Sequence, residues 1–210
     1  MTDLSLDAPG GVLPLFPLRS VLFPGGRLGL QVFEARYLDL VATCLREQRG
    51  FGVVCLAQGQ EVRQPGAPAP LFEPVGVLAR LVDVDAPAAG RLQVRCTGTR
   101  RFRWTGMVEG PNGLWQAEGV QWLADDPPRV VPQPMLPTAL ALARAYAALS
   151  LRADTDLPPE REFGNAGWVA NRWCELLPLS LAARQQLMVL DDPLQRLALV
   201  DRYLRDKKLV

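Results

Sequence analysis

The side chains that most often perform chemistry are scarce in this chain of 210 residues. It contains no histidine, which excludes every mechanism that needs an imidazole, including Ser-His-Asp and Cys-His activation of a nucleophile. The only lysines, Lys207 and Lys208, stand at the carboxyl end, where a Ser-Lys catalytic pair does not fit. The cysteines form no C-x-x-C pair, so we predict buried apolar thiols and no zinc site. They are Cys44, Cys55, Cys96 and Cys174.

Carboxylates remain as potential acids and bases, with Asp83 and Asp85 as the example closest together on one predicted strand. Such a pair of aspartates is common where a strand meets a loop, so we predict no catalytic residue and no enzyme. The sequence also lacks the G-x-x-x-x-G-K-[ST] pattern that cradles the phosphates of ATP. We therefore predict that the chain uses no ATP, no other cofactor and no metal.

The charges are nearly balanced, with 23 basic and 22 acidic side chains and a formal net charge of +1. No overall field is available to hold the chain on nucleic acid or on an anionic membrane. The amino terminus lacks the basic region of a secretory signal. The longest uncharged run, 130–143, contains three prolines and is shorter than the ~20 residues of a membrane span. We expect a soluble cytoplasmic protein without membrane contact.

The predicted strand 92–105 carries a dense group of arginines. Side chains alternate in direction along a strand. Arg100 falls among the inward positions, so either a bulge near Gly98 turns it outward or it pairs with a carboxylate such as Glu34. We favour an ion pair over a ligand contact for Arg100. The alternation places Leu92, Val94, Cys96, Phe102 and Trp104 inward, and Arg95, Arg101 and Arg103 outward.

The arginines belong to a first half, residues 10–124, that we predict to be a β domain. Short apolar runs separated by Gly, Pro and Asp favour a barrel or sandwich over a parallel sheet with crossover helices. Apolar residues recur at helical spacing over 34–48, which predicts one inserted helix. The Pro- and Gly-rich segment 58–71 is predicted to be a mobile surface loop. The predicted strands are 11–18, 28–33, 51–57, 75–85, 91–109 and 115–123.

A proline-rich stretch over 125–134 is predicted to link this β domain to a helical domain over 135–208. Four helices are predicted there, over 136–151, over 167–177, from Ser180 to Leu190, and from Asp192 onward. The last has the clearest start, because Asp192 can cap, Pro193 suits the first position and Gln195 can complete a capping box.

Several short motifs are distributed along nearly the whole length of the chain. Physically, the first of them describe a strand, a Pro-Gly turn, a second strand and the start of a helix. In order, they are LPLFPL at 13–18, FPG at 23–25, FEARY at 33–37, FGVV at 51–54, VGVLA at 75–79, GTRRF at 98–102, WCELLPL at 173–179 and DPLQRL at 192–197. Together they resemble the amino-terminal, substrate-binding domain of Lon-type proteases.

This resemblance implies an α+β fold: a PUA-like β pseudo-barrel with one inserted helix, followed by a bundle of about four helices. It also implies a role in binding protein substrates. We expect a stand-alone, non-catalytic module that recognises unfolded polypeptide, or that acts as an adaptor for a separate protease.

Two of the matched motifs contain rings beside charged groups, a mixture that suits a peptide-binding groove. In the alternative interpretation the rings belong to the core, and Glu34 begins a helix whose dipole favours a carboxylate. Exposed strand edges offer another route to binding, through backbone hydrogen bonds. The predicted peptide-binding residues are Phe33, Glu34, Arg36, Tyr37, Arg100, Arg101 and Phe102.

A second hypothesis is RNA binding by the PUA-like barrel through Arg95, Arg101 and Arg103 with neighbouring rings. The nearly balanced charge disfavours a nucleic-acid partner. Salt discriminates between the two hypotheses, because phosphate contacts weaken steeply as ionic strength rises whereas an apolar groove changes little.

Overall fold

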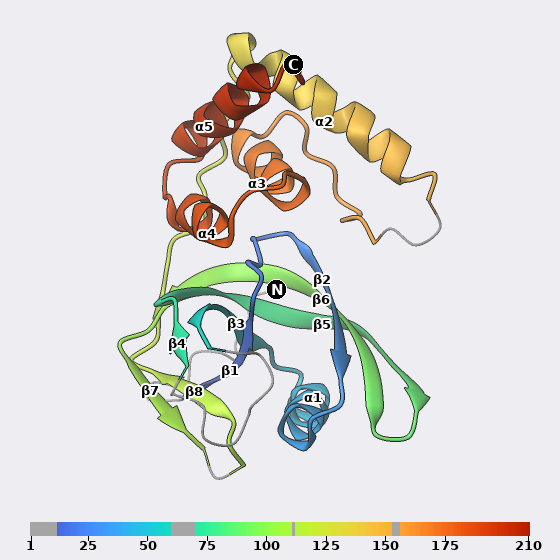
Figure 1. Ribbon diagram of the computed structural model, residues 1–210, viewed down its shortest axis with the longest axis vertical. Helices are drawn as coiled ribbons and strands as arrows, with labels where there is room; N and C mark the ends of the chain where they lie inside the picture. The colour runs from blue at the N-terminus through green and yellow to red at the C-terminus, as the bar shows by residue number, and fades with distance from the viewer. Residues whose placement is uncertain (1–11, 60–69, 111, 153–155) are drawn as a thin grey trace. The chain divides into compact units, whose positions relative to one another are not determined.

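The computed structural model describes residues 12–59, 70–110, 112–152 and 156–210 of the chain. The chain forms two compact units, Met1–Ala124 and Asp125–Val210. The first contains the β-strands and one α-helix, and the second contains the other α-helices (Figure 1). The architecture is therefore α+β, as predicted from the sequence.

The first unit contains a mixed sheet of nine strands among the described residues, in the order β2-β6-β5-β3-β1-β8-β7, with β4 on β3 and β9 on β6. Only the pairing of β1 with β3 is parallel among these described strands. The strands are β1 (Leu13–Leu18), β2 (Arg27–Val32), β3 (Phe51–Gln58), β4 (Leu71–Phe72), β5 (Val75–Ala88), β6 (Arg91–Arg103), β7 (Gly106–Glu109), β8 (Trp115–Glu118) and β9 (Gln121–Trp122).

Two of the predicted strands are each divided by a turn. The run 91–109 breaks after Arg103 into β6 and β7, and the run 115–123 breaks at Gly119 into β8 and β9. Gly119 has a φ of +60°, a left-handed conformation that suits glycine, and the backbone N–H of Thr105 donates to the carbonyl of Glu118 at 3.1 Å. This hydrogen bond joins the turn between β6 and β7 to the turn between β8 and β9.

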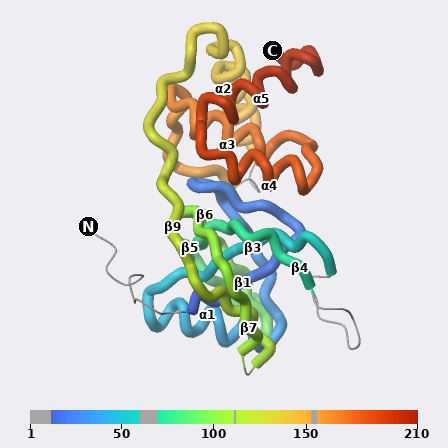
Figure 2. Tube along the Cα trace, turned by 90° about the vertical axis from the view of Figure 1, so that its left-hand side faces the viewer, coloured from blue at the N-terminus to red at the C-terminus, as the bar shows by residue number. Residues whose placement is uncertain are grey.

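Strand β1 is buried on both faces, which explains its continuous apolar sequence. Phe16 stacks on Tyr37 of α1 (Ala35–Glu47), with ring centroids 4.2 Å apart. Both views show α1 beside the strands (Figures 1 and 2). Leu13 and Leu15 belong to a separate core cluster. The helix predicted over 34–48 is thus confirmed, and it packs against β1 through this pair of rings.

The core cluster holds the sheet in a curled shape. Its buried members come from six strands, so the sheet wraps around them as a pseudo-barrel. The ring of Phe102 lies over Gly52 and Gly76, where an added Cβ would approach it to 2.6 and 2.8 Å. Only glycine fits at these two positions beneath the ring. The buried members are Leu13, Leu15, Val54, Leu56, Phe72, Leu78, Phe102 and Ala117.

The predicted surface loop over 58–71 lies largely outside the described residues, which include only its two ends. At these ends Gln58 pairs with Leu71, and Leu56 pairs with Phe72, so that β4 extends β3. The short strand β4 was not predicted from the sequence.

The second unit contains the four predicted helices: α2 (Leu136–Leu149), α3 (Ala166–Leu176), α4 (Leu181–Val189) and α5 (Pro193–Asp206). Figure 2 shows them gathered into one bundle. Asp192 caps α5 as predicted, accepting from the backbone N–H groups of Leu194 at 2.8 Å and Gln195 at 3.4 Å. Ser180 likewise caps α4 by accepting from the N–H of Ala183 at 3.2 Å.

The stretch 125–134, predicted as a linker, is in fact packed into the second unit. The carboxylate of Asp126 pairs with the guanidinium of the buried Arg196 at 2.5 Å. The backbone N–H of Ala166 donates to the carbonyl of Arg129 at 2.7 Å, and that of Val131 donates to Gly164 at 2.9 Å. Proline composition alone could not reveal this, because these partners lie more than thirty residues away in the sequence.

No helix in the described part of the chain combines the length and the apolar composition that crossing a membrane requires.

Candidate polypeptide-binding surfaces

The predicted residues at the start of α1 are mostly held by one another. Arg36 pairs with the Glu34 carboxylate at 2.8 Å and donates to the backbone carbonyl of Gly113 at 3.0 Å. Its guanidinium lies 4.5 Å from the centre of the Tyr37 ring, and Tyr37 itself is buried against Phe16. These contacts join α1 to the β7–β8 hairpin, so they form a structural connection and leave no open groove.

Phe33 differs from its neighbours because 56% of its surface is exposed. It directly follows β2, and in the sequence it stands between the buried Val32 and the half-buried Glu34. Among the predicted residues near α1, Phe33 presents the apolar side chain that a ligand can reach.

The predicted residues on β6 are arranged around a bulge. Val77 pairs with Arg101 and Ala79 pairs with Gly98, so β6 has one residue more than β5 in this interval. Arg100 is consequently exposed, with its guanidinium 5.4 Å from the centre of the Trp122 ring. Of the two interpretations considered for Arg100, the bulge is confirmed. The ion pair that we favoured is not observed among the described residues, and the Glu34 carboxylate pairs with Arg36 instead.

The bulge also corrects the prediction for Arg101. Because Val77 and Ala79 share a face of β5, their partners Arg101 and Gly98 share a face of β6, so the alternation is shifted by one. Arg101 is therefore buried, with 3% exposed, and donates to the carbonyl of Ala124 at 3.0 Å. Phe102 is fully buried in the core cluster. Neither side chain is presented to a ligand.

The two predicted groups do not meet. Val32 pairs with Leu92 near one end of β6, while Arg100 lies eight residues farther along. Measured along β6 at ~3.3 Å per residue, this separation is about 25 Å. The two groups therefore stand toward opposite ends of this strand.

The arginines of the RNA hypothesis are similarly dispersed. Arg95 is ion-paired with Asp83, and Arg101 is buried. Arg103 is exposed and has no ion pair with another described residue. The ion pair with Arg95 also involves Asp83, one of the two aspartates considered as an acid or base. The structure offers no specific observation in favour of RNA binding or of acid-base catalysis.

A group of half-buried side chains, which we call the tryptophan rim, lies at the edge of the core cluster. Trp104 follows β6, Met107 lies on β7, Trp115 on β8 and Trp122 on β9, and Val120 lies between β8 and β9. Trp115 contacts the core edge-on through Phe72, at 5.8 Å between ring centroids, and Trp122 does so through Phe102 at 6.1 Å. The rim consists of Trp104, Met107, Trp115, Val120 and Trp122.

The rim has the composition that protein interfaces favour. Aromatic residues and methionine are enriched at binding surfaces, and tryptophan is among the residues that contribute most to affinity. The exposed side chain of Arg100 lies over the Trp122 ring and therefore adjoins the rim. Sequence reasoning did not identify the five rim residues as a binding site, although three of the five tryptophans in the chain lie within 104–122.

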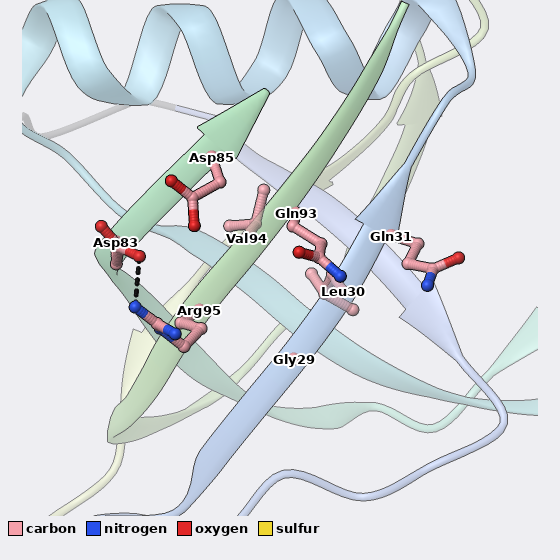
Figure 3. Close-up of a pocket in the computed structure, with 8 residues that line it drawn as sticks. All are labelled: Gly29, Leu30, Gln31, Asp83, Asp85, Gln93, Val94 and Arg95. Atoms are coloured by element: carbon pink, nitrogen blue, oxygen red, sulfur yellow. Dashed lines mark hydrogen bonds and ion pairs between the residues drawn. The ribbon is translucent and has the colours of Figure 1, made fainter. Parts of the chain in front are cut away.

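A second surface, which we call the polar hollow, lies over β5, β6 and β2 and has a volume of about 330 Å³ (Figure 3). Gly29 pairs with Arg95, which pairs with Asp83, and in the adjacent row Gln31 pairs with Gln93, which pairs with Asp85. Residues two positions apart on a strand share a face, so these two rows lie side by side. The lining consists of Gly29, Leu30, Gln31, Asp83, Asp85, Gln93, Val94 and Arg95.

The hollow exists because one position in its rows has no side chain. Around the Cβ position of Gly29 there is no atom within 4 Å, and the side chain of Arg95 turns toward Asp83 (Figure 3). Leu30 and Val94 are buried, so they contribute mainly backbone. Asp85, Gln93 and Gln31 are exposed, and within the described part of the chain their side chains form no hydrogen bond or ion pair.

The cysteines are poorly suited to act as nucleophiles. Burial raises the pKa of Cys44 and Cys55 to about 11 and that of Cys96 and Cys174 to about 12. At neutral pH these thiols are protonated, whereas the thiolate is the reactive form. Among the described residues, no group of three or more Cys, Asp or Glu side chains is placed to hold a metal ion.

Comparison with known families decides how this fold is classified. Residues 12–206 match the model of the "ATP-dependent protease La (LON) substrate-binding domain". The chain belongs to this family. Two Lon proteases, from Anaeromyxobacter dehalogenans and Myxococcus xanthus (Lon protease 2), are 36% and 35% identical over 49% and 47% of this chain. A Lon protease from Parabacteroides distasonis is 24% identical over 91% of it.

These relatives are much longer proteins, because the alignments span only 12%, 12% and 23% of their lengths. The family match therefore identifies this chain with the substrate-binding part of such proteases.

Solved structures show the same fold. A Lon N-terminal domain protein from Xanthomonas campestris superposes with a TM-score of 0.69 at 37% identity, covering 90% of this chain and 96% of that one. The N-terminal domain of a Mycobacterium avium complex Lon protease has a TM-score of 0.57 at 16% identity, and it covers 93% of this chain and 99% of that one. The predicted family and fold are confirmed.

Proposed function

We propose that this chain binds unfolded polypeptide segments at the tryptophan rim and does not cleave them. The observation that carries the proposal is the rim itself, a set of half-buried aromatic and apolar side chains in a domain of the Lon substrate-binding family. Side chains of this kind lose little conformational freedom on binding and remove a large apolar area from water.

The rim suits unfolded segments because such segments expose the apolar side chains that folded proteins bury. Trp115 and Trp122 are already held by edge-on contacts with Phe72 and Phe102, so little ordering of these rings is needed when a ligand arrives. Their indole groups also tolerate varied partners, because the main contribution is apolar contact. This supports recognition of many sequences with modest selectivity.

Two of the residues predicted from the sequence remain in the proposal. Arg100 lies over Trp122, where its guanidinium can donate to a backbone carbonyl of a bound segment. Phe33 supplies a separate exposed apolar contact. We expect the substitutions Arg100→Ala and Phe33→Ala each to weaken binding by about two- to three-fold, because each removes a peripheral contact.

The proposed absence of catalysis is supported by the chemistry of the remaining side chains. The chain lacks histidine, and its thiols are held protonated by burial. Binding without cleavage would make the chain an adaptor that presents polypeptides to a separate protease. Adding the chain to a Lon protease and an unfolded substrate should then accelerate cleavage, and no acceleration would reject the adaptor role.

Fluorescence anisotropy with a labelled, reduced and carboxymethylated model protein tests the binding proposal. We expect Trp115→Ala to raise Kd about ten-fold, because truncation of a central tryptophan typically costs more than 1 kcal/mol of binding energy. Leu45→Ala is the matched control, since Leu45 is 52% exposed on α1 and lies outside the rim.

Thermal unfolding of both variants checks that the fold is retained. Equal affinity of the Trp115→Ala variant and the wild type would reject the rim as the binding surface. Appearance of cleaved probe in the presence of the purified chain would reject the proposed absence of catalysis. Raising the salt concentration should change Kd little, in contrast to binding through phosphates.

A further inference from the structure

We propose that the polar hollow is a second site, which binds an extended polypeptide segment through one of its basic side chains. The cation pairs with Asp85, and the neighbouring backbone of the segment bonds to Gln93 and Gln31. The inference rests on the proposed function, because it takes a polypeptide as the ligand. It adds a preference for basic residues, which an apolar rim cannot provide.

The geometry of the row supports an extended segment. Asp85, Gln93 and Gln31 stand in register on three adjacent strands. Adjacent strands are ~4.8 Å apart, so the row spans about 10 Å, or about three residues of an extended chain at ~3.3 Å each. A short stretch of polypeptide lying across the strands can therefore contact all three side chains.

The polar groups in the row suit a peptide backbone. Each glutamine amide offers both a donor and an acceptor, which matches the alternating N–H and C=O groups of an extended segment. Within the described part of the chain, these side chains have no partner to give up when a ligand arrives. The open space at Gly29, where a side chain is missing, leaves room for that backbone to approach.

Charge complementarity selects a basic side chain. The lining contains the carboxylates of Asp83 and Asp85 and the guanidinium of Arg95. Arg95 is paired with Asp83, so the net charge of the lining is negative and resides on Asp85. A lysine or arginine of the segment compensates this charge, whereas a glutamate in the same place is repelled.

The test uses a labelled, unstructured peptide that carries apolar residues and one lysine, with two twins in which glutamine or glutamate replaces the lysine. Their affinities for the wild-type chain are compared by anisotropy at low salt. We expect the lysine peptide to bind about two- to five-fold more tightly than the glutamine twin, the range of an exposed ion pair, and the glutamate twin to bind most weakly.

The substitution Asp85→Lys should reverse this order, so that the glutamate twin binds most tightly. Gly29→Thr places a side chain that strands favour in the open space at Gly29 and should weaken binding of all three peptides by about two- to five-fold, as for the loss of a peripheral contact. Glu160→Lys, an equal change of charge at an exposed position of the second unit, is the control and should preserve the original order.

An unchanged order in Asp85→Lys, or unchanged affinities in Gly29→Thr, would overturn the inference. Full competition by free lysine amide at the peptide's own concentration would also overturn it, because the hollow would then take a small cation and not a segment. Failure of all three peptides to bind the wild type would instead reject the proposed function. Equal binding of all three by both the wild type and Asp85→Lys would reject only the second site.

Discussion

The tryptophan rim and the polar hollow belong to the same unit but are built in opposite ways. The rim is continuous with the core cluster, because Trp115 and Trp122 contact buried rings. The hollow is lined mainly by polar side chains at the surface, and its shape depends on the missing side chain at Gly29. Changes beneath the rim should therefore affect folding and binding together, whereas changes in the hollow should affect binding alone.

The largest expected effect lies directly beneath the rim. Phe102 is fully buried and supports Trp122, so Phe102→Ala removes a core ring and leaves a cavity. We expect a loss of about 4 kcal/mol in the free energy of unfolding. Urea denaturation measures it. A loss below about 1 kcal/mol would show that Phe102 does not support the core in the way described.

Substitutions at Gly76, beneath the core ring, and at Gly29, in the hollow, allow a direct comparison of the two surfaces. A Cβ at Gly76 would lie 2.8 Å from the Phe102 ring and would also collide with the carbonyl of Val53, whereas at Gly29 it would meet no atom within 4 Å. Gly76→Ala should cost about 3 kcal/mol through overpacking. Gly29→Ala should instead stabilise the chain by about 0.5 kcal/mol, since alanine loses less backbone entropy on folding.

Denaturant midpoints of the two glycine variants provide the test. Similar shifts of the midpoint would contradict the contrast between a packed and an open surface.

Local sequence signals predicted much of the fold, because the groups involved lie close together in the chain. The caps at Ser180 and Asp192 bond to N–H groups within three residues, and both were predicted. The periodicity of residues 34–48 likewise predicted α1. A neighbouring turn or helix is decided largely by neighbouring residues.

The candidate sites were harder to predict, because they depend on contacts between distant residues. The burial of Arg101 results from a bulge between β5 and β6 and from a carbonyl 23 residues away. The rim forms only when β7, β8 and β9 return to the core cluster. The hollow requires Gly29 to align with Arg95 and Asp83 across three strands. Alternation along one strand contains none of this information.

The free energy of unfolding should depend on pH through Glu175, a residue of the second unit that belongs to neither surface. Burial raises the pKa of the Glu175 carboxyl on α3 to about 7, although Arg172 and Arg184 oppose the shift. This folded-state pKa exceeds the ordinary value of 4.5, so the folded state favours the protonated carboxyl. The contribution of Glu175 to the free energy of unfolding is therefore complete below pH 4.5 and is lost as the pH rises to about 7.

The variant Glu175→Gln isolates this effect. Relative to the variant, the wild type should lose on the order of 2 kcal/mol of unfolding free energy over that range of pH. Denaturant titrations of both proteins at several pH values measure the difference. Parallel pH profiles would contradict the raised pKa.

The smallest expected effect concerns the ion pair in the hollow. The side chains of Arg95 and Asp83 are 56% and 41% exposed, so solvent screens their attraction. Arg95→Gln should change the free energy of unfolding by less than about 1 kcal/mol. A loss comparable to that of Phe102→Ala, measured in the same denaturant, would show that the hollow is part of the stabilising core.

Hydrogen exchange measured with and without an excess of a carboxymethylated, unfolded model protein tests the central claim most directly. The account predicts that bound polypeptide slows exchange of backbone amides over residues 104–122, which contain the tryptophan rim. Amides of the α5 helix serve as the internal reference and should exchange at unchanged rates. Binding of the probe without slower exchange over 104–122 would contradict the account.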